Sequence, residues 1–320
     1  MAKRAVVTGA FSYTGAAVAA ELLARGWQVH ALTNRKAPPQ SPVSAGELRF
    51  EPDHLRHQLA GSDVFINTYW IRLPMAGQTF GTAVERSALL LDAAVAAGAR
   101  RIVHISVSNA HLGRNLGYYR GKAEVEDYVR ALPVRHAIVR PTLVVGPRDV
   151  LSSNIAWLLR RFPLFPVPVG KSKLQPITLD DCARIIADAA DGDDNIELDA
   201  AGLDIMTFTD YVRLVEKAAG LRRWIVSAPA WLALAGLRLV EPMVRDVILT
   251  REELLGLEQE LLVSHEAAHG RQSVAGWLNS HGNELGRGYV NDRRRHFGQG
   301  KNEIVLDPSQ LGASTAASES

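Results

Sequence analysis

The sequence predicts an α/β protein, a doubly wound parallel sheet with a smaller C-terminal region. Apolar strand-like runs alternate with helical segments up to about Val145, and this alternation favours parallel strands joined by helices. Two of the runs, residues 63–68 and 102–106, are apolar enough to be central strands that helices cover on both faces. In addition, a turn that contains two glycines joins the first strand to the first helix.

That turn carries a specific signal. Residues 5–8 predict a strand, residues 16–25 a helix closed by Gly26, and residues 27–33 a second strand, which is the order of a dinucleotide-binding Rossmann unit. Gly9 would make the tight turn, Gly15 would let the helix approach the sheet, and the helix N-terminus would receive a pyrophosphate. Ser12 replaces the middle glycine, so its Cβ could displace the phosphate or its hydroxyl could bind it; an ordinary strand–helix turn is the alternative. The predicted cofactor contacts here are Gly9, Ser12, Tyr13, Thr14 and Gly15.

The end of the second strand usually selects the cofactor. A carboxylate there binds the ribose 2′-hydroxyl of NAD, whereas an arginine accommodates the 2′-phosphate of NADP. Residues 32–36 read Leu-Thr-Asn-Arg-Lys and contain no carboxylate. We therefore predict that Arg35 binds the phosphate with help from Asn34 and Thr33, so that NADP(H) is preferred and NAD(H) is possible. Two solvated cations are the alternative. Asp53 and Thr68 are further candidates for cofactor contacts.

A tyrosine and a lysine four residues apart open the helix that follows the strand at residues 101–106. Tyr118 and Lys122 would share one helix face, a turn apart. Lowering a tyrosine pKa from ~10 to neutrality requires about 4 kcal/mol. An ammonium ~4 Å away supplies roughly that at an effective dielectric of ~20. The pair predicts a general acid/base assisted by a cation, with a solvated helix face as the alternative.

Together, the glycine turn and the Tyr-x-x-x-Lys pair resemble the short-chain dehydrogenase/reductase superfamily. Residues 3–280 are most similar to its extended and atypical branch, which includes sugar-nucleotide epimerases and dehydratases, NmrA-like proteins and the dehydrogenase-like accessory subunit of respiratory complex I. Residues 136–142 followed by Gly146-Pro147 resemble the Arg-Pro strand end beside the nicotinamide, and residues 175–181 resemble the segment that returns from the substrate region. The resemblance implies cofactor contacts from Pro141 and Thr142, a hold on the nicotinamide ribose by Lys122, and a possible homodimer.

The same resemblance implies a third catalytic residue, a Ser or Thr at the end of the strand before the tyrosine helix. Its hydroxyl binds the substrate oxygen. The run Ser106-Val107-Ser108 leaves the register open, and we expect Ser108 to fill this role, with Ser106 as the second candidate. Asn109-Ala110-His111 stand where dehydrating members carry acidic residues, which argues against a lyase.

Aromatic residues near the expected nicotinamide end suggest the substrate. Tyr69 and Trp70 follow the strand at residues 63–68, and Trp157 and Phe165 lie in the C-terminal region. They could line a pocket for an apolar or aromatic carbonyl compound, in which Asn154 would anchor a polar group; packing in the core is the alternative.

Length and composition bound the remaining possibilities. A chain of 320 residues that is 47% hydrophobic can bury one large core or a core with a satellite domain. A net charge of +2 gives no sign of nucleic-acid binding, and the single cysteine, Cys182, suits a reducing compartment. The longest apolar stretch, residues 228–240, is short and interrupted by Arg238, so we expect no membrane segment and a cytoplasmic protein.

These observations divide the chain into a Rossmann core at residues 1–146 and a mainly substrate-covering region at residues 147–300. Residues from about 175 to 190 are expected to return to the core. Residues 301–320 are small and polar, as disordered tails are.

One motif points to another chemistry. His265-Glu266-Ala267-Ala268-His269 matches the zinc-peptidase pattern, in which two histidines bind the metal and the glutamate is the base. Gly270 and the polar run after it suggest that the helix ends here. No third ligand stands at a familiar spacing, Glu284 being the best available. We therefore predict no metal site.

The sequence thus favours an oxidoreductase that moves a hydride to or from a carbonyl or alcohol carbon of a small, apolar or aromatic substrate. Two alternatives stay open: an NADPH-binding regulatory or accessory module without chemistry, and a sugar-nucleotide epimerase.

Overall fold

The computed structural model describes residues 2–297, 304–309 and 311, and they form two compact units. Unit 1 comprises residues 2–140, 182–198 and the described residues from 304 onward. Unit 2 comprises residues 141–181 and 199–297. The chain therefore enters unit 2, returns to unit 1 for one helix and one strand, and enters unit 2 again.

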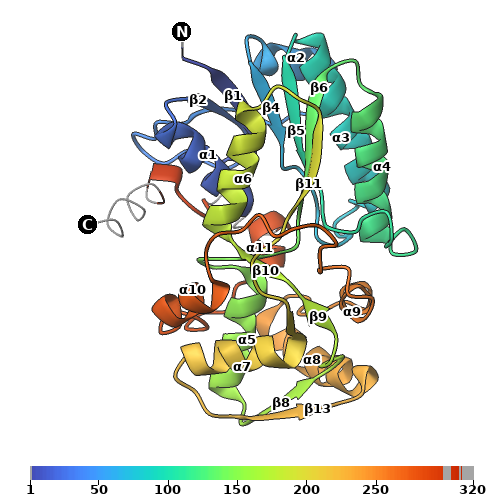
Figure 1. Cartoon of the computed structure of the whole chain (residues 1–320), viewed down its shortest axis with the longest axis vertical. Coiled ribbons are helices and arrows are strands. Elements are labelled where there is room, and N and C mark those ends of the chain that lie inside the picture. The colour runs from blue at the N-terminus through green and yellow to red at the C-terminus, as the bar shows by residue number, and fades with distance from the viewer. Residues whose placement is uncertain (1, 298–303, 310, 312–320) are drawn as a thin grey trace. The chain divides into compact units, whose positions relative to one another are not determined.

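Unit 1 is built on a seven-stranded sheet with the order β11-β6-β5-β4-β1-β2-β3 (Figure 1). Its strands are β1 (Arg4–Thr8), β2 (Gln28–Leu32), β3 (Ser44–Gly46), β4 (Val64–Asn67), β5 (Arg101–Ile105), β6 (Arg135–Pro141) and β11 (Ile196–Ala200). Strands β1 to β6 pair in parallel registers, and β1 lies between β2 and β4. The order reverses between β1 and β4, which is where ligands bind in sheets of this kind. The predicted α/β class with a parallel sheet is confirmed.

Helices cover both faces of this sheet. Helix α3 (Phe80–Ala96) packs against α2 (Pro52–Leu59) and α4 (Gly117–Ala131) on one face. On the other face, Arg25 at the end of α1 (Tyr13–Ala24) forms ion pairs of 2.8 and 3.0 Å with Asp188 and Asp191 of α6 (Leu179–Asp191). The core under α2, α3 and α4 contains Val6, Leu32, Leu55, Phe65, Leu90, Ile102 and Ile138, all fully buried.

Unit 2 consists of short strand pairs and helices. Its strands are β7 (Leu143–Val145), β8 (Leu164–Val167), β9 (Lys173–Leu174), β10 (Pro176–Thr178), β12 (Met206–Thr207) and β13 (Trp224–Ser227). Its helices are α5 (Val150–Arg161), α7 (Phe208–Ala218), α8 (Ala230–Val244), α9 (Arg251–Glu258), α10 (Val274–His281) and α11 (Asp292–Phe297). Strands β7 and β8 pair in parallel with β10 and β13, and β9 pairs antiparallel with β12.

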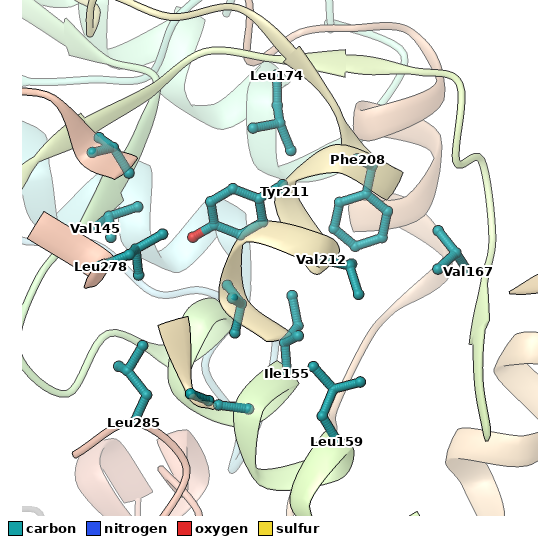
Figure 2. Close-up of a cluster of buried hydrophobic side chains, with 14 of the residues drawn as sticks. Val145, Ile155, Leu159, Val167, Leu174, Phe208, Tyr211, Val212, Leu278 and Leu285 are labelled. Atoms are coloured by element: carbon teal, nitrogen blue, oxygen red, sulfur yellow. The ribbon is translucent and has the colours of Figure 1, made fainter. Parts of the chain in front are cut away.

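The core of unit 2 surrounds Tyr211 of α7 (Figure 2). Its ring is fully buried, and its hydroxyl lies 2.5 Å from the hydroxyl of Ser152 in α5. Val145, Ile155, Leu159, Phe208 and Leu278 belong to this cluster, so that one core joins β7, α5, α7 and α10. Unit 2 has its own hydrophobic interior.

The helix that supplies Ser152 begins at a buried carboxylate. Asp149 is the N-cap of α5, and its Oδ1 accepts a hydrogen bond of 2.6 Å from the Ser152 amide. Its Oδ2 is buried without a hydrogen-bond partner among the residues that the structure describes. Burial raises the pKa of Asp149 from 3.8 to about 6, although its hydrogen bonds and the nearby Arg295 lower it.

This raised pKa predicts a pH-dependent stability. The stability that Asp149 contributes to the folded state is fully present below its unfolded pKa of 3.8. It is lost as the pH rises through the folded pKa of about 6. Replacing Asp149 with Asn keeps a capping acceptor and removes the buried charge. We expect Asp149→Asn to increase the free energy of unfolding above pH 7 by about 1–3 kcal/mol and to change it little near pH 4. Urea unfolding across this pH range measures both, with exposed Asp204→Asn as the control; parallel pH curves for wild type and variant would contradict the prediction.

Two boundaries differ from those that the sequence predicts. The first change of unit falls at 140/141 rather than at residue 146, and residues 182–198, rather than about 175–190, belong to unit 1. The reason is that β7 and β10 pair with each other in unit 2. The expectation of disorder at residues 301–320 is wrong for residues 305 and 306. Val305 and Leu306 are buried, and the Val305 amide donates to the Phe11 carbonyl. Residues 301–303, 310 and 312–320 lie outside the described residues.

Candidate functional site

The turn between β1 and α1 has the backbone that its sequence predicts. Gly9 has a φ of +66°, a backbone conformation that residues with a side chain rarely adopt. The Ser12 amide donates to the Gly9 carbonyl at 2.7 Å. A Cβ at Gly15 would clash with the carbonyl oxygen of Gly9. Glycine at position 15 therefore allows α1 to start directly against the end of β1.

The N-terminus of α1 is suited to an anion. The Ser12 hydroxyl donates to the Gly9 carbonyl at 2.5 Å and does not cap the helix, and no acidic residue stands in the first turn. Ser12 therefore stabilises the turn itself. Amides of a first turn without a side-chain cap are the groups that bind a pyrophosphate in such folds, so the residues present fit a dinucleotide. Thr68 at the end of β4 is tied to β1, since its hydroxyl donates to the Thr8 carbonyl at 2.5 Å.

The residues after β2 have separate roles. The Asn34 side chain binds the Leu48 backbone in both directions, with distances of 3.1 and 3.0 Å, and therefore shapes the loop. The Arg35 amide donates to the Thr33 hydroxyl at 3.1 Å, and the Arg35 side chain is partly exposed. Asp53 is in the first turn of α2, strongly exposed, and paired with Arg56 at 3.1 Å. Of these residues, Arg35 is best suited to meet a 2′-phosphate.

Tyr118 and Lys122 lie in the first two turns of α4. Tyr118 is partly exposed, whereas Lys122 is buried and its ammonium donates to the Ile105 carbonyl at the end of β5, at 2.7 Å. Burial lowers the pKa of Lys122 to about 7, and the charge of Glu126 opposes this shift. An amine with this pKa can exchange a proton near neutral pH.

An aromatic cluster surrounds this pair. The Trp70 ring lies 4.6 Å from the Lys122 ammonium and meets the Tyr118 ring edge-on, with centroids 6.1 Å apart. Phe80 stacks on Trp70 and also contacts Tyr118. A Cβ at Gly121 would come within 3.0 Å of the Trp70 ring, so glycine lets the indole approach the helix. Trp70 thus contacts both Tyr118 and Lys122, and its role toward a substrate stays a prediction.

The end of β5 adds polar groups. The Ser106 hydroxyl is buried and has no hydrogen-bond partner in the described part of the chain, and Ser108 is fully buried. His104 is also fully buried, with one ring nitrogen 3.3 Å from the Asn67 amide and the other without a partner among the described residues. Burial, together with the charges of Lys122 and Arg140, keeps the pKa of His104 well below its ordinary value, so the ring is neutral. Ser106 therefore offers the hydroxyl that is available for a substrate oxygen.

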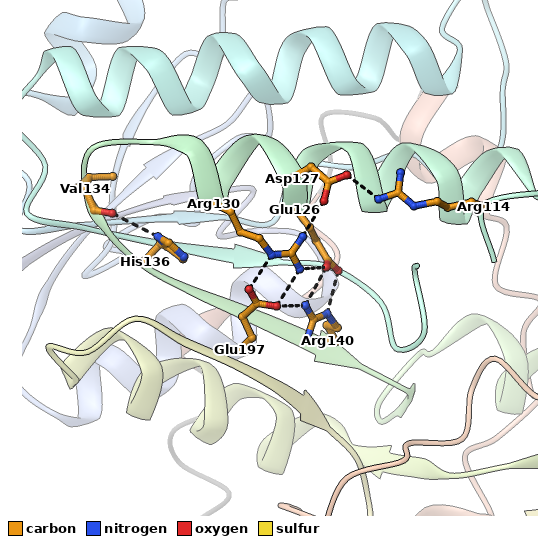
Figure 3. A network of polar contacts seen from close by, with 8 residues as sticks. All are labelled: Arg114, Glu126, Asp127, Arg130, Val134, His136, Arg140 and Glu197. Carbon is orange, nitrogen blue, oxygen red and sulfur yellow. Dashed lines mark hydrogen bonds and ion pairs between the residues drawn. The ribbon is translucent and has the colours of Figure 1, made fainter. Parts of the chain in front are cut away.

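An ion network fixes the helix that carries Tyr118 and Lys122 (Figure 3). Glu126 of α4 is buried and accepts hydrogen bonds of 3.0 and 2.8 Å from Arg140 in β6. Arg130 of α4 contacts Glu126 at 2.9 Å and Glu197 of β11 at 2.7 and 2.8 Å, and Arg140 also contacts Glu197. The network joins α4 to two strands of the sheet.

Several predicted contacts have structural partners instead. The Asn154 side chain exchanges hydrogen bonds of 3.0 and 2.8 Å with the Val290 backbone, and Trp157 is buried between Tyr289 and Arg161. The Thr142 hydroxyl, next to Pro141, donates to the Gln175 carbonyl. The ring of Tyr69 packs on Phe50, and its hydroxyl accepts from Arg86 at 3.3 Å. The prediction of a substrate anchor at Asn154 is therefore wrong, because both polar groups of the amide hold the backbone.

The His265–His269 segment lies outside any helix, since α9 ends at Glu258. Glu266 accepts from the Asp199 amide at 3.0 Å, and His269 contacts the Asp199 carbonyl at 3.0 Å. The described residues contain no group of three or more His, Cys, Asp or Glu side chains that could hold a metal. The segment therefore binds the Asp199 backbone within unit 2.

Comparison with known families identifies the fold's relatives. The model of the NmrA-like family matches residues 1–232. The chain belongs to the NmrA-like family. Its members share a nicotinamide-dinucleotide-binding fold with reductases and epimerases, which agrees with the resemblance that the sequence motifs indicate.

Three individual proteins illustrate this range. The chain is 29% identical to a ceramide reductase of Caulobacter vibrioides over 186 residues, which cover 55% of this chain and 57% of that protein. The chain thus matches little more than half of the reductase's length. It is similar in fold to the Citrobacter sp. triphenylmethane reductase complexed with NADP(H) (TM-score 0.71, 14% identity, 87% of this chain and 99% of that one). It is also similar to the UDP-glucose 4-epimerase of Brucella ovis in complex with NAD (TM-score 0.59, 16% identity, 71% and 86%).

None of the helices in the described part of the chain has the length and hydrophobicity that crossing a bilayer requires.

Sequence reasoning missed four residues of the site. Phe80 and Gly121 shape the aromatic cluster. Glu126 holds α4 through its ion pair with Arg140, and His104 contacts the Asn67 side chain. Gly121 and Glu126 are recognisable only once Tyr118 and Lys122 are placed on a helix, because they lie one residue before and four residues after Lys122. Phe80 and His104 depend on how neighbouring elements pack, for which one sequence holds no signal.

Proposed function

We propose that this protein is an NADP(H)-preferring oxidoreductase that moves a hydride to or from a carbonyl or alcohol carbon of a small apolar substrate. The observation that carries the proposal is the Lys122 ammonium, which lies buried at the end of β5, four residues after Tyr118 on the same helix, and has its pKa lowered to about 7. A lysine on a solvated helix face would keep its charge and its ordinary pKa.

The chain's own residues would share the work as follows. When bound, the nicotinamide cofactor supplies or accepts the hydride. Tyr118 gives a proton to the substrate oxygen in reduction and takes it back in oxidation. Lys122 in its protonated form stabilises the phenolate that remains. The Ser106 hydroxyl, which lacks a protein partner within the described residues, donates to the same substrate oxygen. We therefore favour Ser106 over Ser108 for this role.

The aromatic cluster supports the choice of substrate class. Trp70 and Phe80 present ring edges and faces beside Tyr118, the proposed proton donor. Such surfaces favour apolar or aromatic compounds over a nucleotide sugar, whose hydroxyls would need polar partners. The name of the relative, ceramide reductase, refers to a lipid, which agrees with an apolar carbonyl substrate.

The cofactor preference rests on Arg35. We expect Arg35→Ala to weaken NADPH binding about 10- to 100-fold, because a charge-assisted hydrogen bond to the 2′-phosphate is lost. NADH lacks that phosphate, so its Kd should stay within about twofold. Fluorescence titration with both cofactors measures the effect, and Lys36→Ala, which removes the neighbouring exposed cation, is the matched control. Equal losses for NADPH and NADH would assign Arg35 to the general shape of the site.

A second candidate function is a cofactor-binding module without chemistry, since membership of the NmrA-like family alone does not require catalysis. A screen of ketones, aldehydes and quinones with NADPH separates the two. Substrate-dependent oxidation of NADPH supports the enzyme. Tight NADPH binding with no oxidation by any of these compounds would support the module.

A further inference from the structure

Helix α8 of unit 2 has an unusual distribution of side chains. Of its fifteen residues, only Ala233 is buried. Its outward side, which we term the α8 face, consists of Trp231, Leu232, Ala235, Gly236, Leu239, Pro242 and Met243, all exposed. Trp231 is 70% exposed and Leu239 is 83% exposed. Water-facing helices normally carry polar residues there, and an exposed apolar patch of this extent marks an interaction site.

Strand β13 lies at the same end of unit 2 as α8 (Figure 1) and carries further exposed apolar side chains. Strand β13 pairs with β8 so that Trp224 stands opposite Leu164, and both side chains are exposed. Val226, two residues further along the same face of the strand, is exposed as well. Strand β13 leads directly into α8 through Pro229. The two tryptophans are thus outward on consecutive elements.

The charges around these residues are one-sided. Residues 220–251, which include β13 and α8, contain five arginines and two carboxylates, and Glu252 and Glu253 follow in the first turn of α9. Both carboxylates are turned toward the backbone: Glu241 accepts from the Ile248 amide, and the buried Asp246 accepts from the amides of Val247, Asp292 and Arg293. The arginines are Arg222, Arg223, Arg238, Arg245 and Arg251, of which only Arg223 is not exposed.

We propose that the α8 face and the Trp224 surface dock unit 2 on an anionic membrane, with α8 lying in the interface and not crossing it. Tryptophan is favoured at the headgroup level, aliphatic side chains enter the acyl boundary, and arginines bind anionic headgroups. A second copy of the chain fits less well, because pairing these surfaces would bring the arginines of two copies together, while Glu241 and Asp246 are already bound to backbone amides. The sequence expectation of no membrane contact considered only a spanning segment, which α8 is not.

The test is co-sedimentation of the whole protein with phosphatidylcholine vesicles, with and without phosphatidylglycerol. We expect binding to the vesicles that contain phosphatidylglycerol, and weaker binding when salt is raised from about 0.1 M to about 1 M, since the Debye length falls from about 10 Å to about 3 Å. Leu239→Glu should weaken binding about 10- to 100-fold, the loss expected for one buried leucine side chain. Arg238→Glu should weaken it too, but only on anionic vesicles.

Leu203→Glu is the matched control, because Leu203 is an exposed leucine of unit 2 outside residues 220–251. Equal thermal midpoints for the three variants and the wild type show that folding is intact. Absence of vesicle binding, or binding that Leu239→Glu leaves unchanged, overturns the proposal. So does a concentration-dependent dimer that Leu239→Glu dissociates while no vesicles are bound. The readout involves neither cofactor nor substrate, so it is independent of the proposed function.

Discussion

Replacing Tyr118 with Phe is expected to reduce NADPH-dependent turnover about 10²- to 10⁴-fold, the usual contribution of a positioned proton donor. The phenylalanine ring keeps the edge contacts with Trp70 and Phe80, so the aromatic cluster should persist. Only the proton donor is removed. The Kd for NADPH should therefore stay within about twofold, since the turn at Gly9 and the residues after β2 are untouched.

The measurement pairs steady-state turnover on a substrate from the screen with a fluorescence titration of NADPH. Tyr128→Phe is the matched control, because Tyr128 lies on the same helix and its hydroxyl donates to Asp92 at the surface, at 2.7 Å. Turnover retained in Tyr118→Phe would remove this tyrosine from the chemistry. Lost turnover with lost NADPH binding would indicate a structural role.

Replacing Glu126 with Ala is expected to lower the free energy of unfolding by about 3–5 kcal/mol, as removal of one partner from a buried ion pair does. Glu126 is 3% exposed, and its two oxygens accept hydrogen bonds from Arg140 and Arg130. Without Glu126, the Arg140 guanidinium, which is 11% exposed, would keep only Glu197 as a carboxylate partner among the residues described. Uncompensated positive charge beside β6 is the source of the cost.

Urea unfolding at neutral pH measures this effect. Glu124→Ala is the matched control two residues away, since Glu124 is half-exposed and lies 4.0 Å from Arg120; we expect a loss of less than about 1 kcal/mol. A similar small loss for Glu126→Ala would mean that water or Glu197 compensates Arg140, and that the network does not anchor α4.

The fold could be predicted largely from local pattern. Strands β1, β4 and β5 are short apolar runs, and Gly26 and Gly98 follow the ends of α1 and α3, so their type and order could be inferred without knowledge of packing. The start of α3 at Phe80 was harder to infer, because it depends on Thr79, whose side chain caps the helix by accepting from the Thr82 amide. Helix α9 ends at Glu258, although apolar residues continue to Val263, and Glu260 has a φ of +53° there. Local backbone bonds close that end, since the Leu261 amide donates to the Gly256 carbonyl at 3.0 Å.

The site divides in the same way. Gly9, Gly15, Tyr118 and Lys122 are set by backbone geometry and helix spacing within short segments, and sequence reasoning placed each on the expected turn or helix. Asn34 and Asn154 could not be judged, because their amide groups bind the backbone of residues 14 and 136 positions away. Spacing along the chain holds no record of such partners, so these two polar residues were assigned to ligands.

The discontinuity of unit 1 has a consequence for synthesis. Strand β11 and most of α6 reach their places beside β6 and α1 only after residues 141–181 have been made. During translation, β6 therefore waits as an open edge, and Arg140 has Glu126 but not yet Glu197. A strand whose edge is unpaired is prone to pair with a wrong strand. The nascent chain has to build part of unit 2 before the first sheet can close, so a ribosome that stalls between residues 140 and 200 would release a sheet with an exposed side.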